Sequence, residues 1–459
     1  MSTSRRDFLK NTLLSGAAIG MSSMPVFGKE IIEFSEKQVK ARKGKSMLGF
    51  AAAPINTVRI GFIGLGMRGP DAVRRMMKIE GVEVKALCDL LPERVKKVNA
   101  AVVKEGRPEA AEYSGEEGWK KLCERDDIDL VYTCTPWLLH TPICLYAMKH
   151  GKHAVTEVPA ALTIKDCWEL VNTSESTGRH CMMLENCCYD FFEMATLNMA
   201  RQGLLGEIIH GECAYIHDLR SLKFDTKNGY QGMWRLKEAI KHTGNLYPTH
   251  GLGPVAQIMN IHAGDKFDFL TSMSTNQFGM SLYAVEKYGA DSPEAKQKYK
   301  LGDMNTTLVK TAMGHTIMIQ HDTTSPRPYS RIHILSGTKG IAMKYPQQQI
   351  ALEPSAHSWL PKDKYDDLMK KYEHPLTKQI GEVAKKVGGH GGMDFIMDYR
   401  LIYCLRNGLP LDQSVYDAAA WSSIVELSEI STMNKSKSVE VPDFTRGDWK
   451  KGKPWDVKV

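Results

Sequence analysis

The sequence predicts two units: an N-terminal α/β unit with a doubly wound Rossmann sheet, and an α+β unit built on a mostly antiparallel open sheet. From residue 57 to 186, short apolar strands alternate with helical segments, which is typical of a parallel sheet. From residue 187 to 434 the pattern changes, and strand-like runs occur at 207–217, 268–275, 306–313, 315–321 and 330–336. With 459 residues, the chain is also too long for one ordinary core.

A glycine turn identifies the first unit. The hexapeptide from Gly64 to Gly69 reads G-x-G-x-x-G and begins at the last residue of an apolar strand predicted at 58–64. In this order, Gly64 permits the tight turn, Gly66 lets the backbone approach a pyrophosphate, and Gly69 allows close helix–strand packing. Asp89 ends the next strand, where its carboxylate would hold ribose hydroxyls and repel a 2′-phosphate. The sequence therefore predicts NAD rather than NADP; the alternative is a structural turn with a helix-capping aspartate.

Polar side chains also follow the later strands of this unit. Trp137 and His140 come after the strand at 128–135, Glu157 ends the strand at 152–157, and Asn186 ends the next one. The carboxyl ends of parallel strands share one edge of the sheet, where open α/β sheets bind ligands. We expect these residues to line the cofactor site, although each alone could be an ordinary loop residue.

The N-terminus has the pattern of a targeting signal. Arg5 and Arg6 precede a weakly apolar run at 12–20 that is too short to span a bilayer. We expect residues 1–28 to be a removable twin-arginine leader that exports the folded protein with NAD to the periplasm, without a membrane anchor. The alternative is a chance arginine pair before an ordinary apolar helix. Residues 29–56 are expected to be an irregular lead-in, and residues 435–459 an irregular tail.

Composition excludes several classes of function. The net charge of +7 comes from scattered basic residues, so nucleic-acid binding is not expected. The histidines and cysteines show neither H-E-x-x-H nor paired C-x-x-C spacing, and no metal site is predicted. Most of the ten cysteines are expected to be free thiols that act as small core residues.

Longer motifs add a family resemblance. They are residues 185–189 (ENCCY), 217–220 (HDLR), 244–254 (GNLYPTHGLGP), 321–323 (HDT), 327–329 (RPY) and 389–394 (GHGGMD). In this order they resemble glycoside hydrolase family 109, within the glucose–fructose oxidoreductase/inositol dehydrogenase (Gfo/Idh/MocA) superfamily. The resemblance implies an NAD-dependent α-N-acetylgalactosaminidase that acts on a small-molecule or glycan substrate. It also implies oxidation at C3 of the sugar, elimination, water addition and re-reduction, and a possible homo-oligomer.

The resemblance also implies site residues. The NAD contacts would be Met67, Arg68, Asp89, Trp137, Leu138, Leu139, His140, Glu157, Val158 and Asn186. The substrate contacts would be Tyr215, Arg235, Tyr247, Pro248, Thr249, His250 and Tyr329. Oxidoreductases of the superfamily usually carry Glu-Lys-Pro where this chain has Glu157-Val158-Pro159. The missing lysine favours the hydrolase over an exported sugar oxidoreductase, the main alternative.

Two residues are candidates for proton transfer. His250 is the first, because imidazole titrates near neutral pH and can both take and give a proton. Tyr189 is the second, provided that its phenol pKa is lowered. His390, between glycines, could also approach the site. The alternatives are a histidine that only caps a turn, tyrosines that only pack, and a non-catalytic sugar-binding protein.

Overall fold

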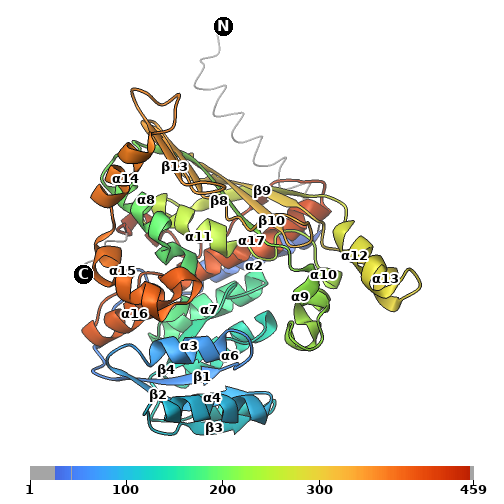
Figure 1. The fold of residues 1–459 in the computed structure, drawn as a ribbon, viewed down its shortest axis with the longest axis vertical. Helices are drawn as coiled ribbons and strands as arrows, with labels where there is room; N and C mark the ends of the chain where they lie inside the picture. Colours follow the sequence, from blue (N-terminus) through green and yellow to red (C-terminus); the bar gives the residue numbers. More distant parts are fainter. Residues whose placement is uncertain (1–25, 43, 455–459) are drawn as a thin grey trace.

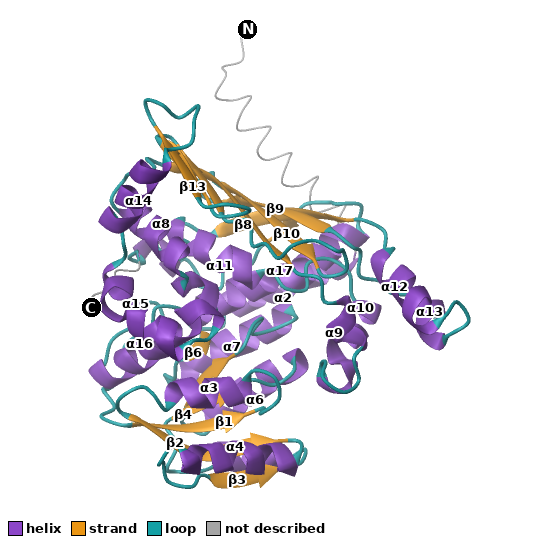
Figure 2. Cartoon of the chain, viewed as in Figure 1, coloured by secondary structure: helices purple, strands orange, loops and turns teal. Residues whose placement is uncertain are grey.

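The computed structural model describes residues 26–42 and 44–454 as two sheets with helices packed between them (Figures 1 and 2). The predicted leader lies outside the described residues, apart from residues 26–28, which begin helix α2 (Val26–Val39). Among the described residues, no helix combines the length and the apolar character that crossing a membrane requires.

The first sheet is a six-stranded parallel sheet in the order β3-β2-β1-β4-β5-β6. Its strands are β1 (Val58–Ile63), β2 (Val82–Asp89), β3 (Ala111–Ser114), β4 (Leu130–Thr133), β5 (His153–Thr156) and β6 (Cys181–Met183). The connecting helices are α3 (Gly69–Met76), α4 (Pro92–Lys104), α5 (Gly118–Cys123), α6 (Trp137–Lys149) and α7 (Ile164–Thr177). The strand order reverses between β1 and β4, so a ligand crevice is expected at their carboxyl ends. The predicted Rossmann unit is confirmed.

The second sheet has eight strands in the order β13-β12-β11-β7-β10-β9-β8-β14. They are β7 (Ile208–Ile216), β8 (Phe267–Ser274), β9 (Asn305–Thr311), β10 (Thr316–Asp322), β11 (Ile334–Gly337), β12 (Gly340–Met343), β13 (Gln349–Leu352) and β14 (Val439–Glu440). Only β7 and β10 pair in parallel, which agrees with the prediction. The expected strand at 330–336 begins later, at Ile334, because Ile332 and His333 have positive φ values that interrupt the extended backbone.

Helix α17 (Val415–Met433) lies between the two sheets (Figure 1) and contacts both α7 and β8. Trp421 at its centre is fully buried. Its polar side joins the Rossmann unit: Ser422 Oγ accepts a hydrogen bond from the Ala160 amide (3.0 Å), and Glu426 accepts one from the Ile164 amide (2.6 Å). This helix fixes the second unit against the segment that follows β5.

The remaining helices surround this junction. They are α8 (Phe191–Arg201), α9 (Arg220–Phe224), α10 (Trp234–Lys241), α11 (Thr249–Ile258), α12 (Gly279–Tyr288), α13 (Pro293–Lys296), α14 (Lys362–Lys371), α15 (Pro375–Val387) and α16 (Met393–Asn407). Short 3₁₀ turns occur at η1 (Asn186–Tyr189), η2 (Gln231–Met233), η3 (His390–Gly392) and η4 (Asp448–Lys451). All ten cysteines are free thiols and nine of them are buried, which confirms their predicted role in the core.

The prediction of an irregular lead-in is wrong for its first part, because α2 continues to Val39. Ile31, Phe34 and Ser35 are spaced along one helical face, and Ser35 Oγ accepts a hydrogen bond from Trp168 on α7. In the predicted irregular tail, the described residues 435–454 contain one two-residue strand and a short 3₁₀ turn. Strand β14 extends the second sheet, and Phe444 packs against Trp168 with ring centroids 4.7 Å apart.

Candidate active site

The glycine turn has the shape that a pyrophosphate requires. Gly64 has φ of 90°, and a Cβ there would lie 2.7 Å from the carbonyl carbon of Cys134. A Cβ on Gly69 would lie 2.0 Å from the Gly64 carbonyl oxygen. At Gly66 the nearest atom is only the mobile Arg94 guanidinium, 3.5 Å away, so this backbone stays accessible to a ligand.

Asp89 closes the turn from the end of β2. Its carboxylate accepts hydrogen bonds from the backbone amides of Leu65 (2.6 Å) and Leu91 (3.0 Å). Those bonds place the carboxylate beside the glycine turn, at the position where this fold holds a ribose.

Exposed apolar side chains border the same crevice. Met67, Leu90 and Leu138 are all more than half exposed. They follow β1, β2 and β4, which are neighbours in the sheet, so the three lie along one edge. A dinucleotide's rings would cover such apolar surface, and this edge therefore fits the predicted cofactor.

Asp394 on α16 contacts two of the predicted NAD contacts, Arg68 and Asn186. Arg68 lies 3.2 Å from the Asp394 carboxylate and 3.0 Å from that of Glu157, while Asn186 donates its amide hydrogen to Asp394. His390 also contacts Asp394, at 2.9 Å. It therefore approaches the cofactor edge, the edge of the first sheet at which NAD is predicted to bind. Burial alone would raise the pKa of Asp394, but the His390 hydrogen bond and the Arg68 charge hold it below its usual range. The second unit thus supplies the carboxylate that orders the cofactor edge.

The side chains of Trp137 and His140 point into the protein. Trp137 Nε1 donates to the Val158 carbonyl (3.1 Å), and both ring nitrogens of His140 lie within 2.8 Å of backbone carbonyl oxygens of Thr135 and Pro159. These residues hold the ends of β4 and β5 together. Leu138 and Leu139, between them, face outward and are exposed.

Aromatic rings line the predicted substrate side. Tyr215 at the end of β7 lies against Tyr247, with ring centroids 4.5 Å apart, and 6.3 Å from Tyr329. The Arg235 guanidinium lies 4.8 Å from the Tyr247 ring and 4.9 Å from the Trp137 ring. Trp137 belongs to the Rossmann unit, so this cluster joins the two units at the site.

Tyr247 and His250 are placed by the start of α11. Pro248 is its N-cap and Thr249 its first residue, and Thr249 is fully buried. Pro248 and Thr249 therefore act through the backbone. They set the Tyr247 and His250 side chains side by side, with Oη and Nε2 3.4 Å apart.

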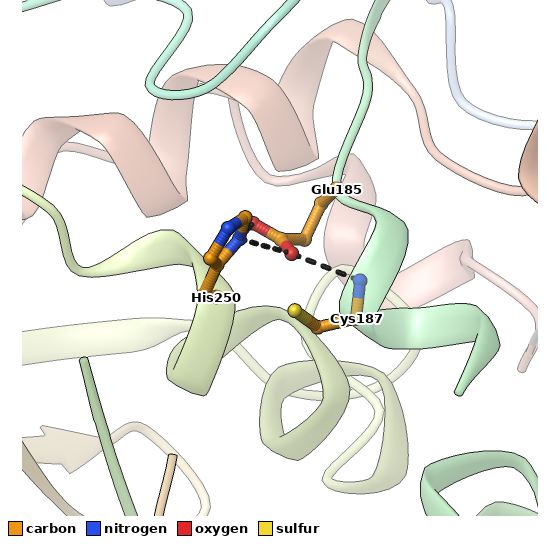
Figure 3. A group of neighbouring side chains, drawn as sticks. All are labelled: Glu185, Cys187 and His250. Atoms are coloured by element: carbon orange, nitrogen blue, oxygen red, sulfur yellow. Dashed lines mark hydrogen bonds and ion pairs between the residues drawn. The ribbon is translucent and has the colours of Figure 1, made fainter. Parts of the chain in front are cut away.

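His250 is paired with a carboxylate. Its Nδ1 lies 2.8 Å from Glu185 Oε1, and the Cys187 amide donates to the same oxygen (Figure 3). Burial alone would raise the pKa of the fully buried Glu185, but the charge and hydrogen bond of His250 lower it. Because Glu185 is thus ionised, Nδ1 carries the shared proton, and Nε2 on the partly exposed side is left for proton transfer.

The expectation of a lowered phenol pKa at Tyr189 is wrong. Tyr189 is fully buried and donates a hydrogen bond to Asp412 (3.2 Å), away from the Tyr215 and Tyr247 cluster. Burial and the negative charge of Asp412 raise its pKa well above the usual value. Its role is to pack and to hold the start of α8.

Sequence reasoning missed Glu185 and Asp394 as site residues. A usable signal existed for Glu185, which directly precedes Asn186 at the end of a strand and lies within the ENCCY motif. Asp394 likewise ends the GHGGMD motif, but its place on a helix of the other unit gave no indication that it contacts the cofactor residues.

Comparison with known proteins agrees with this geometry. Residues 189–451 match the model of the glycosyl hydrolase 109 C-terminal domain, and residues 58–185 match the oxidoreductase-family NAD-binding Rossmann fold. The chain belongs to glycoside hydrolase family 109. NAD is the cofactor of its Rossmann unit, as the match to the NAD-binding family model shows.

The relatives cover nearly the whole chain. An α-N-acetylgalactosaminidase of Bacteroides fragilis is 56% identical over 88% of this chain and 96% of its own length. A family 109 protein of Porphyromonas gingivalis is 49% identical over 96% of this chain and 95% of its own.

Solved structures confirm the fold at lower identity. A levoglucosan dehydrogenase in complex with NADH and levoglucosan is 16% identical, with a TM-score of 0.64 over 84% of this chain and 100% of that one. An aldose–aldose oxidoreductase from Caulobacter crescentus is 18% identical, with a TM-score of 0.60 over 84% of this chain and 100% of that one.

Replacing Asp89 tests the cofactor site. Asp89→Ala removes the carboxylate beside the glycine turn, so we expect NAD affinity to fall by about tenfold or more, the loss typical of a charged hydrogen-bond partner. Calorimetry with NAD and the dinucleotide content of purified protein measure the effect. Glu83→Ala, at the exposed start of the same strand, is the matched control; full cofactor occupancy in Asp89→Ala would contradict the assignment.

Proposed function

We propose that this chain hydrolyses terminal α-linked N-acetylgalactosamine in an NAD-dependent reaction. The observation that carries the proposal is the His250–Glu185 pair, which lies between the aromatic cluster of Tyr215 and Tyr247 and the unit that binds NAD. The name of the Bacteroides fragilis relative supports the sugar, since most of both chains align.

When bound, NAD would be held by the glycine turn and Asp89 and would supply the hydride acceptor for C3 of the sugar. The chain's own part is proton transfer and positioning. His250 Nε2 moves a proton at C2, the carbon that the C3 ketone acidifies, and buried Glu185 stabilises the imidazolium that results. Tyr215 and Tyr247 hold the sugar ring, and Arg235 binds its polar substituents. This chemistry needs no carboxylate pair across the glycosidic bond.

An exported sugar oxidoreductase is less well supported. Position 158, where the superfamily's oxidoreductases carry lysine, holds a valine that is only 2% exposed and offers no proton-transfer group. The acid–base group near the nicotinamide must then come from the second unit, as His250 does.

The redox balance separates the two functions. We expect release of sugar from an aryl α-N-acetylgalactosaminide without added cofactor, and no net change in nicotinamide absorbance, because each hydride taken is returned. A panel of aryl glycosides measures this when absorbance is followed both for the released aryl group and for reduced nicotinamide. Steady accumulation of reduced cofactor with one sugar as sole substrate would favour the oxidoreductase instead.

A graded set of variants tests the roles at the site. His250→Ala should keep NAD bound but lower kcat by at least about a hundredfold, as expected for loss of a general base. Glu185→Gln keeps the imidazole but removes its carboxylate partner. Its kcat should lie between those of His250→Ala and the wild type. Tyr189→Phe is the control, and its kcat should stay within about threefold of the wild type, since the lost hydroxyl bonds Asp412 rather than the substrate. Undiminished turnover in His250→Ala would reject the assignment.

We also propose export of the folded, NAD-loaded chain to the periplasm by the twin-arginine route. The support is the Arg5-Arg6 pair ahead of a short apolar run, together with a cofactor that must be acquired before export. Cell fractionation should find the wild type in the periplasm and the Arg5→Lys, Arg6→Lys variant in the cytoplasm. Equal periplasmic amounts of both would contradict this route.

A further inference from the structure

Three potential metal ligands converge beside the aromatic cluster. A carboxylate oxygen of Glu185, the Sγ of Cys187 and a ring nitrogen of His250 all lie within 4.8 Å of one another (Figure 3). Glu185 and Cys187 are fully buried at the start of η1, and the Cys187 amide fixes the Glu185 carboxylate at 3.1 Å. The cluster is thus held in place by packing and by the backbone, whether or not an ion is bound.

The donor types select for one class of cation. Imidazole nitrogen, thiolate sulfur and carboxylate oxygen are the ligands of zinc, which binds them at about 2.0–2.3 Å in tetrahedral sites. Ligand atoms of such a site stand about 3.3–3.8 Å apart, so side-chain shifts of about 1 Å would close this one. Magnesium and calcium require oxygen ligands and do not suit it. We propose that Glu185, Cys187 and His250 form a binding site for a zinc-class divalent cation that inhibits the enzyme.

The charges balance once the cation is bound. In the free enzyme the Cys187 thiol donates a hydrogen bond to Asn186 Oδ1 (3.5 Å) and therefore carries its proton. A coordinating dication displaces that proton to solvent, and the resulting thiolate and the Glu185 carboxylate together neutralise its charge. Three protein ligands leave a fourth position open to water, at the partly exposed side of His250.

Inhibition follows from the His250–Glu185 pair. Nδ1 of His250 cannot hold both the metal and the proton that it shares with Glu185, so coordination breaks the pair and removes the proton-transfer group. The inhibitory consequence rests on the proposed function, whereas binding itself does not.

The sequence did not predict this site because its ligands have no motif spacing. His250 is 65 positions from Glu185. Cys187 and Glu185 are only two residues apart, and no second histidine or cysteine stands at the intervals of known zinc motifs. Folding of η1 against the start of α11 creates the cluster.

Zinc chloride added to the NAD-loaded full chain tests the proposal. We expect about one zinc ion per chain by elemental analysis after gel filtration. Cobalt(II) should give the near-ultraviolet charge-transfer band of a thiolate ligand. Glycosidase activity should fall with zinc, return with a chelator, and be indifferent to magnesium.

Two serine variants of neighbouring cysteines make the matched comparison. Cys187→Ser should keep basal activity and bound NAD but weaken zinc binding and inhibition by about tenfold or more, the usual cost of losing a ligand group. Cys188→Ser, which removes a thiol that is equally buried but outside the cluster, should behave as the wild type. Absence of bound zinc, or the same zinc affinity in both variants, would overturn the proposal.

The metal measurements also separate this proposal from the proposed function. Zinc bound through Cys187 in a chain without glycosidase activity would contradict the proposed function alone. An active glycosidase that binds no zinc would contradict this inference alone.

Discussion

Helix α17 is the element on which the geometry of the site depends. It lies between the two sheets, with Trp421 fully buried at its centre. Two of its side chains, Ser422 and Glu426, accept hydrogen bonds from backbone amides just beyond the Val158-Pro159 segment. Buried amides without a partner cost free energy, so the helix can satisfy both only in one position. That position sets the distance between the cofactor edge and the aromatic cluster.

A second constraint comes from charge buried at the same junction. Asp394 is fully buried, and an unpaired carboxylate there would be strongly destabilising. It is paired with Arg68, Arg75 and His390, and it accepts from Asn186. Arg68 and Asn186 are predicted cofactor contacts on the first unit, whereas Asp394 belongs to the second. Pairing of the Asp394 carboxylate therefore holds Arg68 and Asn186 together, although nothing in the local sequence links these residues.

The sequence predicts what local patterns determine. Alternating strands and the glycine turn fix the Rossmann unit and the side of the sheet that carries the site, and residues 58–69 and Asp89 were sufficient for this. Pairings between distant segments were not predictable, such as Glu185 with His250 or Asp394 with Arg68, because no local rule brings them together. Tyr189 was misjudged because its motif position gives no information on whether its hydroxyl meets solvent, substrate or Asp412.

Valine at position 158, which is buried and offers no proton-transfer group, agrees with the proposal that this group stands on the second unit. A lysine at that position would extend from the end of β5, beside the cofactor, and would serve the carbon that loses hydride. A reaction that also breaks the bond at C1 needs proton transfer at C2, one atom further from the nicotinamide. His250 stands on α11 of the second unit, and Glu185 at the end of β6 fixes its ring orientation. A base on the second unit, in place of a lysine at position 158, thus agrees with a reaction that proceeds by elimination rather than by oxidation alone.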